Sequence, residues 1–97
     1  MDRCDQADLQ NRIEEIQYVS CTEIVRPSGQ EYDDNIWTLR IGLTRNPNGN
    51  ELRGLVNMVK GYHGIHVKNT EYIEPEQTLY VYFGHNHVRT DDWPFNY

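Results

Sequence analysis

Alternating apolar and polar residues predict several strands, of which the clearest covers residues 37–43. Within it Trp37, Leu39, Ile41 and Leu43 are separated by polar residues or glycine. A period of two places these four side chains on one face of a strand. The segment is therefore expected to lie at the centre of a half-buried sheet.

The same alternation predicts three further strands, over 17–25, 65–68 and 78–83. The inward side chains expected from the first of these are Val19, Cys21 and Val25, with Glu23 interrupting the pattern. Between the last two strands, 71–76 is expected to be an acidic linker. Four strands suffice for one sheet.

Two segments have helical spacing instead. Asn50 is a candidate N-cap for an amphipathic helix over 50–61, whose apolar residues recur at intervals of three and four. A weaker N-terminal helix, capped by Asp5 or Asp8, would carry an apolar stripe. The stripe consists of Leu9, Ile13 and Ile16.

These elements occur in the order (α)ββαββ, which predicts an α+β fold. With 97 residues the chain is expected to form a single domain over 1–97, with 1–8 and 88–97 as its mobile ends. About four strands would form one sheet, with the amphipathic helix packed on one face. The connection from the second strand through this helix to the third has the form of a split crossover.

The polar positions of the strands predict a second, aromatic and basic face on the sheet. Its expected members are Tyr18, Ser20, Thr22, Thr38, Arg40, His66, Lys68, Tyr80 and Tyr82. Rings mixed with cations are typical of platforms that bind single-stranded nucleic acid, for which the candidates are Arg40, Lys68, Tyr80 and Tyr82. The alternatives are that the first helix or a twin subunit covers this face, or that a protein partner does.

Charge favours a protein partner over nucleic acid. The chain has 15 acidic and nine basic residues and a formal net charge of −6. Residues 1–34 have a net charge of −6, residues 35–70 of +4 and residues 71–97 of −4. An acidic protein is repelled by phosphates and attracted to basic surfaces.

Candidate chemistry is sparse, so no enzymatic activity and no cofactor are expected. Cys4 and Cys21 form no redox or metal motif, and no serine lies in a glycine-flanked elbow. The histidines form two close pairs, which makes a zinc site a weak candidate that is not predicted. These residues are His63, His66, His85 and His87. Without a long apolar run, the chain is expected to be cytoplasmic and not to bind membranes.

The sequence therefore favours a non-catalytic protein-binding module. In size, charge and lack of catalytic motifs it resembles the compact acidic inhibitors of nucleic-acid-handling proteins, including phage anti-CRISPR proteins and immunity proteins. The expected partner is a basic protein surface, with contacts from Glu31, Asp33, Asp34, Asp91, Asp92, Trp93, Tyr80 and Tyr82. Direct nucleic-acid binding and a homodimeric structural or regulatory role are the alternatives.

Overall fold

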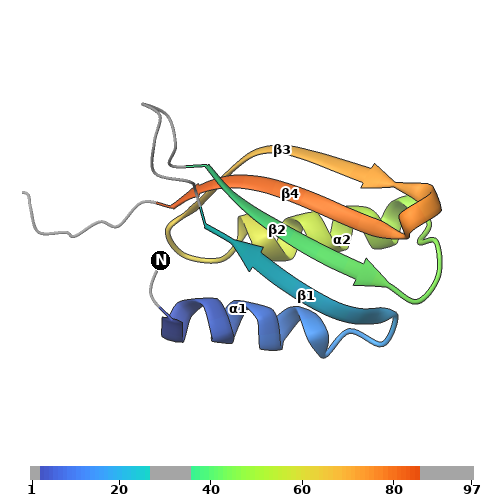
Figure 1. Cartoon of the computed structure of the whole chain (residues 1–97), viewed down its shortest axis with the longest axis horizontal. Coiled ribbons are helices and arrows are strands. Elements are labelled where there is room, and N and C mark those ends of the chain that lie inside the picture. The colour runs from blue at the N-terminus through green and yellow to red at the C-terminus, as the bar shows by residue number, and fades with distance from the viewer. Residues whose placement is uncertain (1–2, 27–35, 86–97) are drawn as a thin grey trace, which may run out of the picture.

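The structure is a computed structural model that describes residues 3–26 and 36–85. Its elements are α1 (Arg3–Glu14), β1 (Val19–Val25), β2 (Ile36–Leu43), α2 (Gly49–Lys60), β3 (Ile65–Ile73), the short 3-10 helix η1 (Glu74–Glu76) and β4 (Thr78–His85). This described part is a small α+β domain with two α-helices and a four-stranded antiparallel sheet (Figure 1). The predicted α+β class is confirmed, and the order of elements agrees with the prediction apart from η1 between β3 and β4.

The strands lie in the order β1-β2-β4-β3, and each is antiparallel to its neighbour. Since β2 and β3 are both antiparallel to β4, they run in the same direction, with β4 between them. The connection through α2 is therefore a crossover split by β4. In place of the predicted linker, β3 extends to Ile73 and contains Glu71.

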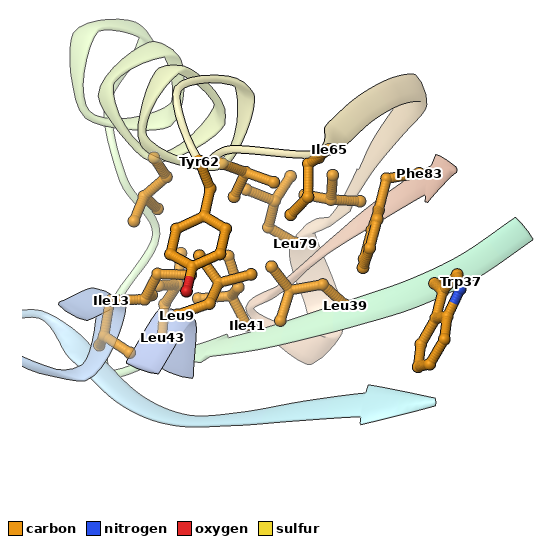
Figure 2. Packing of buried hydrophobic residues seen from close by; sticks show 14 residues of the cluster. Leu9, Ile13, Trp37, Leu39, Ile41, Leu43, Tyr62, Ile65, Leu79 and Phe83 are labelled. Atoms are coloured by element: carbon orange, nitrogen blue, oxygen red, sulfur yellow. The ribbon is translucent and has the colours of Figure 1, made fainter. Parts of the chain in front are cut away.

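The core lies between the sheet and the helices. The predicted inward residues of β2, β3 and β4 are buried, except that Val67 is half-buried. Figure 2 shows these side chains packed against α2, with Leu9 and Ile13 of α1 at one end of the cluster and Trp37 at the other. Both helices thus contribute to one core on one face of the sheet.

The interpretation that α1 covers the second face is wrong, because α1 joins the same core as α2. The Tyr62 hydroxyl, just beyond α2, donates to the carboxylate of Asp8 at 2.9 Å. Burial and this hydrogen bond raise the pKa of Tyr62 to about 12. On the strand side, Gln10 donates to the Thr22 carbonyl at 3.1 Å, and the Thr22 N–H donates to Glu14 at 3.1 Å. Side chains of α1 therefore form hydrogen bonds with both the N–H and the carbonyl of Thr22 in the edge strand β1.

The predicted inward residues of β1 are correct at Val19 and wrong afterwards. The pairing with β2 shifts between Val19 and Cys21, which is a β-bulge. A bulge inserts one extra residue and exchanges the faces of the residues that follow. Cys21 is consequently exposed, whereas Ile24 packs on the core.

The N-cap of helix α2 lies two residues before the predicted cap. It is Asn48 rather than Asn50, and the Asn48 side chain accepts from the Glu51 N–H at 2.8 Å. Glu51 in return accepts from the Asn48 N–H at 3.0 Å, which completes a capping box. The same carboxylate also accepts hydrogen bonds from the two terminal guanidinium nitrogens of Arg45, each at 2.8 Å. This network fixes the start of the helix.

The stability of the domain is expected to fall between pH 4.5 and pH 2 in part because Glu51 becomes protonated. Hydrogen bonds from Arg45, then from the Asn48 N–H, hold the pKa of Glu51 at about 2, below its ordinary 4.5. A carboxylate with a lowered folded-state pKa stabilises fully above its unfolded pKa and loses that contribution as pH falls. In urea unfolding, the free energy of unfolding should fall less between pH 7 and the acid range for Glu51→Gln and Arg45→Gln than for the wild type. Equal losses in all three proteins would contradict this role.

Candidate functional site: the sheet face opposite the helices

The face of the sheet opposite the helices contains a continuous row of charged and aromatic residues. Arg40 of β2 pairs with Glu23 of β1 on one side and with Tyr80 of β4 on the other. Tyr80 in turn pairs with Glu71 of β3. We call this surface the tyrosine face. In the part of the chain that the structure describes, neither α-helix covers it, and Figure 1 shows β2 and β4 in front of α2.

Tyr80 lies at the centre of this row and has partners at both its ring and its hydroxyl. The Arg40 guanidinium carbon lies 5.6 Å from the ring centroid, a cation–π distance. Arg40 also donates to Glu23 at 2.8 Å, and the Tyr80 hydroxyl donates to Glu76 at 2.9 Å. The Tyr80 oxygen and then Glu23 raise the pKa of Arg40. The guanidinium is thus already paired within the chain.

Tyr82 extends the aromatic surface by one row. Its ring is nearly parallel to that of Tyr80, with 6.4 Å between centroids and 13° between planes. Burial, followed by the negative charge of Glu71, raises the pKa of the Tyr82 hydroxyl. Glu71 itself is exposed. The second tyrosine therefore lies beside a solvent-accessible carboxylate.

Apolar side chains border the tyrosines toward one end of the sheet. Val25 pairs with Thr38 and Ile36 pairs with Gly84, which places both on the tyrosine face. Val25 is 42% exposed and Ile36 is 37% exposed, and Met58 of α2 is the one other large apolar side chain classed as exposed among the described residues. Exposed apolar residues next to aromatic ones are typical of protein contact surfaces.

A shallow hollow of about 100 Å³ opens on the same face at Gly42. A Cβ atom at Gly42 would lie 2.9 Å from the Cys21 sulfur, so glycine leaves space for the Cys21 side chain. Small-molecule pockets are typically about 300–1,000 Å³. The hollow is therefore better suited to a single side chain of a partner than to a cofactor.

The structure keeps on this face the four residues that the sequence named as nucleic-acid candidates, Arg40, Lys68, Tyr80 and Tyr82. The Arg40 guanidinium lies over the Tyr80 ring, and the Tyr82 ring stacks beside that of Tyr80. The Lys68 side chain lies over Gly84, one row beyond Tyr82. The predicted contacts Glu31, Asp33, Asp34, Asp91, Asp92 and Trp93 lie outside the described residues.

Two expected members of the face lie elsewhere. Thr22 turns toward α1 because of the bulge in β1. Tyr18 packs against the core, and its ring lies 4.9 Å from the Arg45 guanidinium carbon. The sequence reading missed Glu71 and Glu76 as neighbours of the tyrosines, since it assigned both to a linker.

The histidines do not gather into a metal site in the described ranges. His63 stacks on Tyr62 with 4.7 Å between centroids and lies 4.0 Å from Asp5. His66 pairs with Gly84 and His85 pairs with Ile65, so the two side chains occupy opposite faces of the sheet. Among residues 3–26 and 36–85 no three His, Cys, Asp or Glu side chains form a candidate metal cluster. His87 lies outside these ranges.

Comparisons with protein-family models, with curated proteins and with solved structures find no match to this chain. Neither described α-helix is long and apolar enough to cross a membrane.

Proposed function

We propose that this protein is a non-catalytic binding module that recognises a basic protein surface through its tyrosine face. The observation that carries the proposal is the stacked pair Tyr80–Tyr82 on the sheet face opposite both helices. Tyrosines give large contact area at low entropic cost and are enriched among the residues that dominate binding energy. Val25 and Ile36 supply apolar contact area beside them.

The charges on this face favour a protein over nucleic acid. Each tyrosine lies near a carboxylate, Glu76 for Tyr80 and Glu71 for Tyr82. Arg40 is engaged by Glu23, which weakens its attraction for a phosphate. A polyanion would meet these carboxylates and a chain of net charge −6, whereas a basic surface would be attracted.

The more specific proposal is that the partner is a nucleic-acid-handling protein, which this acidic domain inhibits in the cytoplasm of the producing or host cell. Small size and net negative charge support it, because a basic nucleic-acid channel is complementary to both. Glu31, Asp33, Asp34, Asp91, Asp92 and Trp93 remain predicted additional contacts. Single-stranded nucleic-acid binding is the second candidate, because Arg40, Lys68, Tyr80 and Tyr82 share one face.

Replacing both tyrosines should abolish partner capture. Tagged wild-type chain and the variant Tyr80→Ser/Tyr82→Ser would be incubated with nuclease-treated and untreated lysate at low and raised salt. A captured protein, identified by mass spectrometry and purified, should bind the wild type directly and the variant at least about 30-fold more weakly, the size typical of an aromatic anchor. Raised salt should weaken the wild-type complex.

Met58→Ser is the matched control, because it removes an exposed apolar side chain from α2 rather than from the tyrosine face. It should bind like the wild type. Circular dichroism must show all variants folded. Equal binding of the purified partner by the tyrosine variant would overturn the proposed contact surface. Capture that is lost on nuclease treatment would instead support the nucleic-acid candidate.

A further inference from the structure

Three tyrosines of this domain share one arrangement, in which an arginine lies over the ring and is paired with a carboxylate. The guanidinium carbons lie 4.9 to 5.7 Å from the ring centroids. Each arginine has a carboxylate oxygen within 2.8 to 3.2 Å. The three sets are Tyr18–Arg45–Glu51, Tyr62–Arg12–Asp8 and Tyr80–Arg40–Glu23. Tyrosine, arginine and carboxylate thus form a recurring unit in this fold.

Tyr82 has two of the three components. Its ring stacks beside Tyr80, and Glu71 of β3, which pairs with Tyr80, is the diagonal neighbour of Tyr82 on the same face of the sheet. Among the described residues, the arginines that lie over tyrosine rings are those of the three complete sets, and none lies over Tyr82. Tyr72 also lacks such an arginine, but it lies on the helix side of β3, where its hydroxyl donates to Asn46.

We propose that Tyr82 and Glu71 form a binding site for an arginine side chain of the partner, which completes a fourth set on the tyrosine face. This inference rests on the proposed function and names the partner group that the face recognises. The guanidinium would lie over the Tyr82 ring and donate to Glu71, as Arg40 does with Tyr80 and Glu23 one row away. Arginine suits this site better than lysine because its planar group can stack and donate at the same time.

Lys68 separates this proposal from nucleic-acid binding. Its side chain lies over Gly84, one row beyond Tyr82, and so places a positive charge near the proposed site. An incoming arginine is repelled by that charge, whereas a phosphate is attracted to it. Lys68→Gln should therefore strengthen the binding of an arginine ligand and weaken the binding of a nucleic acid.

The test is an NMR titration of the full chain with a blocked peptide of three arginines spaced by glycines. The expected result is saturable shifts centred on the amides of Glu71 and Tyr82, with a much smaller response to the same peptide carrying citrulline, which lacks the charge. Tyr82→Leu and Glu71→Gln should each weaken binding about three- to fivefold. Tyr82→Phe, which keeps the ring, should bind like the wild type.

Glu15→Gln is the charge-matched control, since Glu15 is an exposed carboxylate in the turn just after α1. It should leave the affinity within about 1.5-fold of the wild-type value. Equal weakening by Glu15→Gln and Glu71→Gln would overturn the site in favour of general charge attraction. The site would also be overturned if the amide signals of Tyr82 and Glu71 did not shift with the peptide. Saturable shifts of these amides with oligothymidine in place of the peptide would overturn it as well.

Failure of this inference can be told apart from failure of the proposed function. A chain that ignores the arginine peptide, yet binds its purified partner through Tyr80 and Tyr82, retains the binding function without this site. A chain that binds the peptide at Tyr82, yet holds the partner equally well after both tyrosines are replaced, retains the site without the proposed partner contact.

Discussion

Replacing Phe83 with alanine is expected to lower the free energy of unfolding by about 3–5 kcal/mol. Phe83 is fully buried and is the largest of the fully buried side chains. Its ring stacks with Trp37 at 6.3 Å between centroids, so truncation removes apolar burial and leaves a cavity against the indole. For a domain of this size the melting temperature should fall by at least about 12 °C.

The adjacent residue Tyr82 provides the matched comparison, because neighbours on a strand point to opposite faces. Tyr82→Ala should cost only about 1 kcal/mol, the scale of a cross-strand contact, while it weakens partner binding. Urea unfolding of both variants, with partner binding measured in parallel, separates the two roles. A loss of stability for Tyr82→Ala as large as that for Phe83→Ala would mean that the tyrosine face is itself part of a packed interior.

The central strands could be predicted from the sequence because their alternation is regular. Every second residue is buried from Trp37 to Leu43 in β2 and from Leu79 to Phe83 in β4, with no irregularity in their shared register. The two-residue period of a strand is therefore enough to predict that one face carries Tyr80, Tyr82 and Arg40. That part of the candidate site required only the period of a strand and one amphipathic helix to cover the other side.

The rest depended on features that alternation does not encode. Each edge strand contains a bulge, between Val19 and Cys21 in β1 and between Val67 and Asn69 in β3. One extra residue reverses the faces that follow, so Thr22 and Val25 were assigned to the wrong sides. Sequence spacing also could not show that Glu71 pairs with Tyr80, because register is set by the whole sheet.

The edges of the sheet bear on the homodimer that the sequence left open. Bulges and charged residues hinder edge-to-edge pairing, and both edge strands have them, with Glu23 in β1 and Lys68 in β3. In β1 the side chains of α1 also occupy the backbone groups of Thr22. A homodimer, if it forms, is therefore better accommodated by a sheet face than by an added strand.

Ile13→Ala is expected to destabilise the domain by about 2–5 kcal/mol, because α1 is part of the core rather than an appended segment. Ile13 has 0% exposure and lies in the same cluster as Leu55 and Val59 of α2. Asn11→Ala, on the exposed side of α1, is the control and should change stability by less than about 0.5 kcal/mol.

Hydrogen exchange gives the structural readout of the Ile13 variant. Helix α1 supplies the acceptor for the Thr22 N–H through Glu14, so loosening the helix should speed exchange at Thr22 before the central strands open. The exposed edge of β1 should then make the variant associate at raised concentration, which sedimentation would detect. If Ile13→Ala leaves the unfolding midpoint unchanged and only Thr22 exchanges faster, α1 is a detachable cover of the β1 edge. A cooperative loss of hydrogen-exchange protection across the whole sheet would instead establish α1 as a structural layer of the domain. The tyrosine face then remains the surface open to a partner.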